Sequence, residues 1–118
     1  MACALVADGK KGEDIVILDV RKLTYVTDYF VIGTGFNPRQ LQSIADESIE
    51  KLKALGASVL GMEGRASARW ILVDFGDVVL HLFDRDARKF YDLELLWGDA
   101  PKVPWGTGPA PRPPVARG

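Results

Sequence analysis

The stretch that most constrains the fold runs from Trp70 to Phe83 and consists of two apolar runs around Gly76-Asp77. The runs, residues 70–75 and 78–83, are rich in β-branched and aromatic side chains, which favour β-strands. A two-residue connection that begins with glycine fits a type II′ turn, because glycine readily adopts the positive φ of the first turn position. The pattern therefore predicts a β-hairpin in which Trp70 faces Phe83 across the paired strands.

The two faces of this predicted hairpin differ in character, because side chains alternate between the faces of a sheet. Mixed aromatic and polar surfaces are typical of protein contact sites, whereas a wholly apolar face is expected to join the core. One face is wholly apolar: Ile71, Val73, Phe75, Val78, Leu80 and Leu82. The other mixes aromatic and aliphatic residues with a carboxylate and the one histidine: Trp70, Leu72, Asp74, Val79, His81 and Phe83. Two interpretations of the mixed face stay open, a contact surface for a partner or a face covered by a helix or loop of the same chain.

The composition limits the kinds of function open to the chain. With 15 basic and 16 acidic residues the net charge is −1, which argues against binding nucleic acid by charge alone. One cysteine and one histidine allow neither an internal disulfide nor a Cys/His metal site, and we predict no metal or cofactor. No apolar run is long enough to cross a membrane and the first residues lack the pattern of a signal peptide, so a cytoplasmic location is expected.

Outside the hairpin, the chain alternates between strand-like and helix-like patterns. Asn37 suits the N-cap of a helix and Gly56 the position after its end, with a regular apolar stripe between them. Asp84 or Asp86 can cap a last helical segment that ends near Trp97. Shorter patterns occupy the rest: a helical turn at residues 2–7, buried strands at 15–20 and 29–32, and a weak strand at 58–62.

The composition changes after Trp97. Six of the seven prolines lie in residues 101–114, with glycines between them and few core-forming residues. Such a segment buries too little apolar surface to offset the entropy of ordering it. We therefore expect a single domain at residues 1–97 and a disordered tail at 98–118, in which Trp105 is the one candidate for docking on the domain.

Two features invite an enzymatic interpretation. Gly33-Thr34-Gly35 precedes the predicted helix, and helix N-termini attract phosphate, but Pro38 stands where the dinucleotide fingerprint needs a third glycine. His81 and Asp74 are diagonal neighbours in the predicted hairpin and suggest an acid/base pair, but no Ser or Cys nucleophile accompanies them on that face. A tight strand-to-helix turn and a contact-face or structural histidine explain the same residues, and we expect no catalysis.

Three segments of the chain carry a family pattern. They read DYFVIGTGFNPRQLQSIADE from Asp28, RWILVDFGDVVLHLF from Arg69 and ARKFYDLELLW from Ala87. In this order they resemble the ribosomal silencing factor family (RsfS, also called Iojap or YbeB), over about residues 13–97. The resemblance implies a two-layer α/β fold with a mixed, mostly five-stranded sheet, related in shape to nucleotidyltransferases but without their catalytic motif.

The resemblance also implies a function. Members of this family bind the large ribosomal subunit through ribosomal protein uL-fourteen and sterically block joining of the small subunit, which lowers translation in nutrient limitation or stationary phase. The implied protein is a translational repressor and not an enzyme, and it is a monomer or homodimer when free. The implied contact surface combines the mixed hairpin face with three residues that follow it: Trp70, Leu72, Asp74, Val79, His81, Phe83, Tyr91, Asp92 and Glu94.

Two alternatives from other classes remain at this point. The first is a nucleotidyltransferase-like nucleotide-binding protein or enzyme. The second is a homodimeric interaction module whose exposed hairpin face pairs with itself. A minor contact with ribosomal RNA is also considered for a set of basic residues, against the alternative of scattered surface charge: Arg65, Arg69, Arg85, Arg88 and Lys89.

Overall fold

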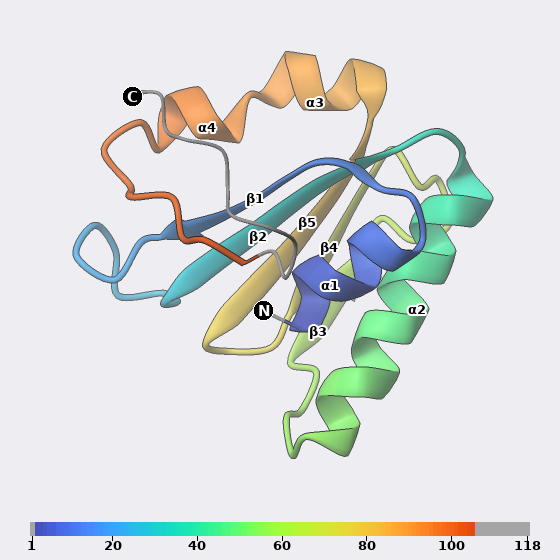
Figure 1. Ribbon diagram of the computed structural model, residues 1–118, viewed down its shortest axis with the longest axis horizontal. Coiled ribbons are helices and arrows are strands. Elements are labelled where there is room, and N and C mark those ends of the chain that lie inside the picture. The colour runs from blue at the N-terminus through green and yellow to red at the C-terminus, as the bar shows by residue number, and fades with distance from the viewer. Residues whose placement is uncertain (1, 106–118) are drawn as a thin grey trace.

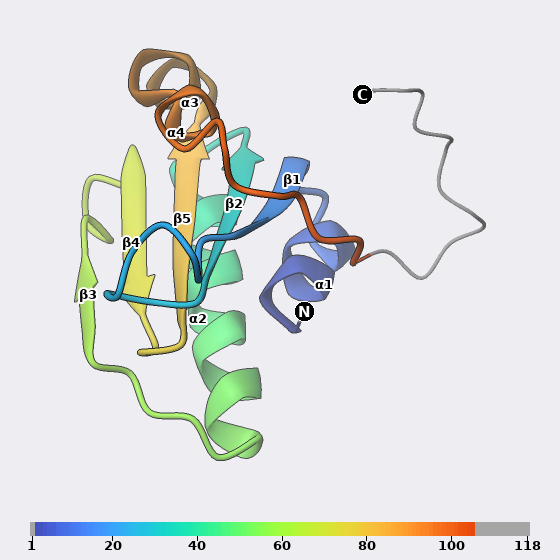
Figure 2. The ribbon, with the colours of Figure 1, turned by 90° about the vertical axis from the view of Figure 1, so that its left-hand side faces the viewer.

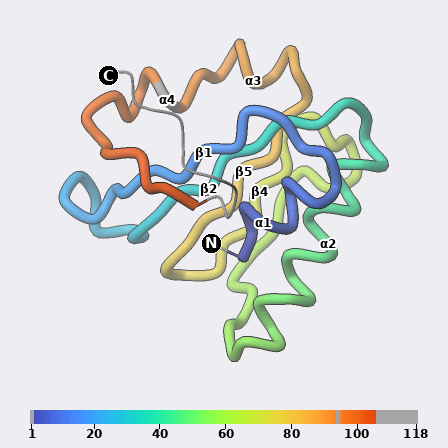
Figure 3. Tube along the Cα trace, viewed as in Figure 1, coloured from blue at the N-terminus to red at the C-terminus, as the bar shows by residue number. Residues whose placement is uncertain are grey.

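The computed structural model describes residues 2–105, apart from the side chain of Glu94. The described chain forms five strands and four helices (Figure 1), and its Cα trace can be followed in Figure 3. In chain order they are α1 (Ala2–Gly9), β1 (Glu13–Asp19), β2 (Tyr29–Gly35), α2 (Pro38–Ala54), β3 (Gly61–Glu63), β4 (Trp70–Asp74), β5 (Val78–Asp84), α3 (Arg85–Tyr91) and α4 (Leu93–Leu96).

The five strands form one mixed sheet in the order β1-β2-β5-β4-β3. β2 and β5 at its centre are parallel, and the other neighbouring pairs are antiparallel. A parallel pair needs a long crossover connection, which α2, β3 and β4 supply between β2 and β5. The predicted α/β class and mixed five-stranded sheet are confirmed.

Helices cover the two faces of the sheet unequally (Figures 1 and 2). α1 and α2 pack together on one face and bury the wholly apolar side of the hairpin. α3 and α4 lie against the other face, near the end of β5. The main core therefore sits between the sheet and the first two helices, and its fully buried side chains include Leu41, Ile44, Ile71, Val73, Leu80 and Leu82.

The hairpin forms with the predicted register. All five residues of β4 face their predicted partners in β5, beginning with Trp70 opposite Phe83. At the turn, the Phe75 N–H donates to the Val78 carbonyl at 2.9 Å, and Gly76 has a φ of +93°. An L side chain rarely adopts this φ, so the turn depends on glycine at that position.

α2 begins and ends where the sequence predicts. The Asn37 side-chain oxygen accepts a hydrogen bond from the Gln40 N–H at 2.8 Å, which satisfies one of the free N–H groups of the first turn. Gly56, just after the helix, has a φ of +97°. The other predicted elements are present with boundaries that differ by a few residues; β2, for example, extends to Gly35 because its parallel pairing with β5 continues that far.

The described structure extends past the predicted domain boundary at residue 97. Backbone hydrogen bonds of 2.8 Å join Pro101 and Val103 to β1, and the Trp105 Nε1–H donates to the Ile15 carbonyl at 3.2 Å (Figure 2). The free edge of β1 supplies these hydrogen bonds, which composition does not reveal. The boundary at 97 and the disorder expected for residues 98–105 are therefore corrected, whereas the rest of the predicted tail lies outside the described residues.

Candidate protein-binding surface

The mixed face of the hairpin is partly covered by α3, α4 and the residues that follow them. Phe83 is fully buried there, against Ala87 of α3 and Leu93 of α4. His81 is only 5% exposed, and Val79 is buried to a similar extent. The structure therefore shows that the same chain covers this part of the face.

Two aspartates cap the two short helices that follow the hairpin. Asp84 caps α3 through a hydrogen bond of 2.7 Å from the Ala87 N–H, as predicted. Asp92 ends α3 in the left-handed conformation (φ 32°, ψ 63°), and its side chain accepts the Leu95 N–H at 3.2 Å as the N-cap of α4. The one helical segment predicted after the hairpin is therefore two helices, because Asp92 leaves the helical conformation and caps the next turn.

Trp70 connects the buried and the exposed parts of this region. Its Nε1–H donates to Nδ1 of His81 at 3.1 Å. The centroid of its ring lies 5.0 Å from that of Phe83 and 4.4 Å from that of Tyr91. Aromatic pairs at such distances contribute about 0.5–1.5 kcal/mol beyond the burial of their surface. Trp70 is thus held from below by two buried rings and packs against a more exposed one.

His81 is neutral near pH 7, because burial lowers the pKa of its imidazole from 6.5 to about 4. Nδ1 accepts the Trp70 hydrogen bond, so the proton of the neutral ring lies on Nε2. Nε2 has no hydrogen-bond partner among residues 2–105. Asp74 accepts the Gly76 N–H at 2.8 Å and does not bond to His81. The two residues considered as an acid/base pair therefore each form a hydrogen bond with a different neighbour.

Large apolar side chains at the end of α3 and in α4 are exposed. Phe90 is 80% exposed, Leu95 77% and Leu96 72%; together with Tyr91 they form what we call the α3–α4 apolar surface. Monomeric proteins rarely leave several large apolar side chains side by side in water unless a partner covers them. The ring contact between Tyr91 and Trp70 makes this surface continuous with the exposed part of β4.

Phe90 and Leu96 belong to the segment predicted as the last helix, and the structure leaves both side chains exposed. Six of the eight residues from Phe90 to Trp97 are apolar. A short helix lying on a sheet buries one side only, so a run this dense cannot be buried at every position. The high proportion of apolar residues in this run was the signal in the sequence for an exposed apolar surface.

The nine residues predicted to contact a partner are not equally accessible. The three in β5 are buried within the chain, so their side chains cannot contact a partner while the fold stays closed over them. The three in β4 are half-buried, two at the end of α3 are exposed, and the Glu94 side chain lies outside the described residues. The three in β5 are Val79, His81 and Phe83, the three in β4 are Trp70, Leu72 and Asp74, and the two at the end of α3 are Tyr91 and Asp92.

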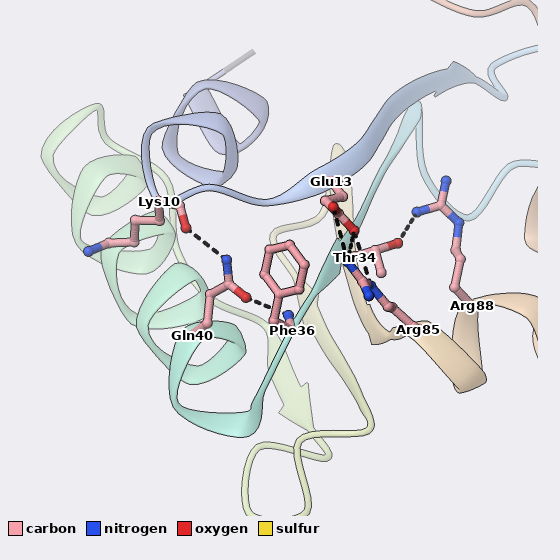
Figure 4. Close-up of polar contacts among 7 residues, drawn as sticks. All are labelled: Lys10, Glu13, Thr34, Phe36, Gln40, Arg85 and Arg88. Carbon is pink, nitrogen blue, oxygen red and sulfur yellow. Dashed lines mark hydrogen bonds and ion pairs between the residues drawn. The ribbon is translucent and has the colours of Figure 1, made fainter.

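Polar groups around the end of β2 bond to one another (Figure 4). The Gln40 Nε2–H donates to the Lys10 carbonyl at 2.9 Å, and Oε1 of the same side chain accepts the Phe36 N–H. Thr34 Oγ1 accepts a hydrogen bond of 2.6 Å from the Arg88 guanidinium. Thr34 of the suggested phosphate-binding loop is therefore bonded to α3, and Gln40 joins the first turn of α2 to the residues just after α1 and β2.

Packing explains the glycine at the end of β2. A Cβ atom at Gly35 would lie 2.6 Å from Cδ2 of the buried Leu41, so a larger residue would push α2 away from the sheet. Beside it, Arg85 forms an ion pair with Glu13 at 3.0 Å, and its guanidinium lies 4.4 Å from the centroid of the Phe36 ring. These contacts fit the alternative of a tight strand-to-helix connection.

Several of the basic residues considered for contact with RNA are engaged within the chain. Arg65 pairs with Asp46, Arg69 lies 3.5 Å from a carboxylate oxygen of Asp84, and Arg85 pairs with Glu13. The Asp46 carboxyl has its pKa lowered by the hydrogen bond from Arg65. All these pairs are largely exposed, so each contributes little to stability.

Three further observations bear on chemistry. Within residues 2–105, no group of three or more His, Cys, Asp or Glu side chains is placed to hold a metal ion. None of the helices in that range has the length and apolar character needed to cross a membrane. Burial raises the pKa of the Cys3 thiol to about 11, so this cysteine is an inert part of the contact between α1 and the core.

These features define a class: a small α/β domain with a mixed five-stranded sheet that presents an apolar surface on its last two helices. The family model described as ribosomal silencing factor during starvation matches residues 1–116. RsfS of Bacillus subtilis (strain 168) is 48% identical over 98 residues, which cover 83% of each chain. The chain therefore belongs to the ribosomal silencing factor family.

Other relatives agree with this assignment. A crystal structure of a protein from Chromobacterium violaceum superimposes with a TM-score of 0.79 at 37% identity, covering 92% of this chain and 85% of that one. The chloroplastic protein Iojap of Arabidopsis thaliana is 36% identical over 100 residues, which cover 85% of this chain and 42% of that protein. Membership in this family of regulatory proteins supports a ribosome-associated silencing role.

Proposed function

We propose that this protein represses translation by binding the large ribosomal subunit through ribosomal protein uL-fourteen and sterically blocking the joining of the small subunit. Membership in the ribosomal silencing factor family supports the ribosomal target. The observation that carries the proposal is the α3–α4 apolar surface, whose large side chains stand in water in the isolated chain. Such a surface calls for a macromolecular partner.

The size of this surface suits a protein partner. Burying one exposed leucine or phenylalanine in an interface contributes about 1.5–3 kcal/mol. Few residues usually dominate the affinity of an interface, and aromatic residues are prominent among them. We therefore assign the leading contributions to Phe90, Tyr91 and the half-buried Trp70, with Leu95 and Leu96 completing the apolar centre.

The predicted contact residues keep a place in this proposal, with two kinds of role. We assign a peripheral role to Leu72, Asp74, Asp92 and Glu94, in which carboxylates would meet basic groups of the ribosomal protein. Charge complementarity of this kind mainly sets the rate and register of encounter. Two of the three buried residues of β5 support the surface from within, Phe83 through its ring contact with Tyr91 and His81 through Trp70, whereas Val79 is buried in the strand.

The proposed mechanism is steric and needs no chemical step. A folded domain bound where the small subunit docks occupies volume that the small subunit requires. Blocking would lower translation when nutrients are limiting or growth has stopped, in keeping with the family description, which refers to starvation. We place this action in the cytoplasm, with any contact to ribosomal RNA secondary to the contact with uL-fourteen.

The test is co-sedimentation of the purified chain with separated ribosomal subunits. A matched pair of exposed leucines makes the comparison sharp, since Leu95 is 77% exposed on the α3–α4 apolar surface and Leu55 is 73% exposed at the end of α2. We expect Leu95→Ala to weaken binding to the large subunit about tenfold or more, and Leu55→Ala to leave it unchanged. Binding to neither subunit, or equal effects of the two variants, would contradict the proposal.

The same surface governs the state of the free protein. If two copies bury their α3–α4 apolar surfaces against each other, the free protein is a homodimer that must separate before it binds the ribosome. Size-exclusion chromatography over a concentration series distinguishes this homodimer from a monomer. Leu95→Ala shifts the elution toward the monomer only in the first case, and Leu55→Ala does so in neither.

A further inference from the structure

His81 is a polar residue in an apolar position. Its ring is enclosed by three aromatic rings, with centroid distances of 4.9 Å to Phe30, 5.9 Å to Trp70 and 6.3 Å to Phe83. It is 5% exposed and lies in the central strand β5. Neighbours of this kind suit phenylalanine at least as well as histidine.

Histidine at this position costs stability that phenylalanine would not. Its Nε2 is buried with no hydrogen-bond partner among residues 2–105. A buried donor without an acceptor is unfavourable, whereas an apolar ring of similar size carries no such penalty. What the histidine provides that phenylalanine cannot is an acceptor, Nδ1, which receives the Trp70 Nε1–H at 3.1 Å. The benefit of the residue therefore lies in what it does to Trp70.

Trp70 needs such a constraint because of where it lies. It is half-buried at the start of β4, and the centroid of its ring lies 4.4 Å from that of Tyr91 and 5.0 Å from that of Phe83. A half-exposed indole has room to change its rotamer, and a hydrogen bond to a fixed strand residue selects one orientation. Because Tyr91 belongs to the α3–α4 apolar surface, the orientation of Trp70 determines how that surface is supported.

We infer that His81 is a positioning residue: its Nδ1 holds the Trp70 indole in the orientation that supports Tyr91, and so shapes the α3–α4 apolar surface for its partner. The inference rests on the proposed function for the identity of that partner, but the local geometry can be tested without it. It requires the tautomer with the proton on Nε2, because Nδ1 must be free to accept.

Two substitutions separate positioning from folding. His81→Phe keeps an aromatic ring and removes the acceptor, and His81→Asn restores an acceptor close to the position of Nδ1. We expect His81→Phe to fold with a melting temperature at or above that of the native chain and to bind the large ribosomal subunit about tenfold more weakly. His81→Asn should recover part of this loss. In the background of Trp70→Phe, which has no indole donor, His81→Phe should cause no further loss.

Nuclear magnetic resonance gives the direct readout. Nitrogen-15 shifts should show Nδ1 of His81 as the unprotonated nitrogen, and the Trp70 indole N–H, assigned by its absence in Trp70→Phe, should exchange slowly with solvent. In His81→Phe that indole signal should move and exchange faster, and the Tyr91 ring signals should shift with it. An indole signal and an affinity that both stay unchanged in His81→Phe would overturn the inference.

The design distinguishes the two proposals. If the native chain binds no ribosomal subunit, the proposed function fails, and the positioning role is then decided by the indole and Tyr91 signals alone. If the native chain binds and His81→Phe binds equally well with a released indole, the proposed function stands and the positioning role is refuted. Additive losses in the double variant His81→Phe, Trp70→Phe would likewise refute it, because the two residues would then act independently.

Discussion

Acid should weaken the folded state through His81. In the unfolded chain this histidine regains its ordinary pKa of 6.5, whereas burial holds the pKa at about 4 in the folded protein. Between these two values the unfolded chain binds more protons, so the free energy of unfolding falls as the pH falls. The contribution of the neutral His81 to the free energy of unfolding is fully present above pH 6.5 and is lost by about pH 4. The gap between the two pKa values corresponds to about 3 kcal/mol, of which about 2 kcal/mol is lost by pH 5.

The measurement is urea denaturation of the native chain and of His81→Phe, at several pH values between 7 and 4.5. Carboxylates contribute equally to both proteins, so the difference in unfolding free energy between them isolates the histidine. Asp19, whose pKa is lowered to about 2 by its hydrogen bonds from Arg21, titrates below this range. We expect the free energy of unfolding of His81→Phe, relative to that of the native chain, to rise by about 2 kcal/mol from pH 7 to pH 5. A difference that stays constant over this range would refute the assignment of a buried, neutral His81.

Three further substitutions test the local structure, each by urea denaturation. Gly64→Ala should destabilise by about 3 kcal/mol, because Gly64 has a φ of +81° and a Cβ there would lie 2.0 Å from the Trp70 carbonyl oxygen; Gly61→Ala, which meets no atom within 4 Å, should change little and serves as its control. Asn37→Ala should cost about 1 kcal/mol through loss of the α2 cap, and an unchanged stability would argue against that cap. Trp105→Ala should cost about 1–2 kcal/mol and speed amide exchange along β1, whereas no effect on β1 would show that the segment after α4 does not pack there in solution.

The hairpin could be predicted in detail because its determinants are local. Alternation of side chains fixes which residues share a face, and the position of Gly76 fixes the register that places Trp70 opposite Phe83. The cap at Asn37 and the glycine after α2 are local signals of the same kind. Together with the family resemblance, they were sufficient for the class of fold and for the mixed sheet.

The candidate surface was only partly predictable because burial depends on distant contacts. The mixed face of the hairpin was recognised, but which of its residues are covered depends on where α3 and α4 lie. That placement follows from the break at Asp92, a single residue in the left-handed conformation, which the apolar pattern of the segment does not reveal. Phe90 and Leu95 consequently emerged as exposed residues only with the structure.

The ordered segment after α4 was missed for a related reason. Its composition, rich in proline and glycine, predicts disorder when the segment is considered alone. The edge of β1 offers unpaired backbone groups, and Pro101 and Val103 use them. This pairing also covers an edge strand that would otherwise be open to other chains.

The central claim is that the α3–α4 apolar surface keeps the two ribosomal subunits apart. Its most direct test is to mix purified subunits with the native chain, with Leu95→Ala or with Leu55→Ala, and to follow the formation of joined ribosomes by light scattering. We expect the native chain and Leu55→Ala to reduce joining in proportion to the large subunit bound, and Leu95→Ala to require about tenfold more protein for the same effect. Joining that proceeds at the normal rate and extent with the large subunit saturated by the native chain would contradict the claim.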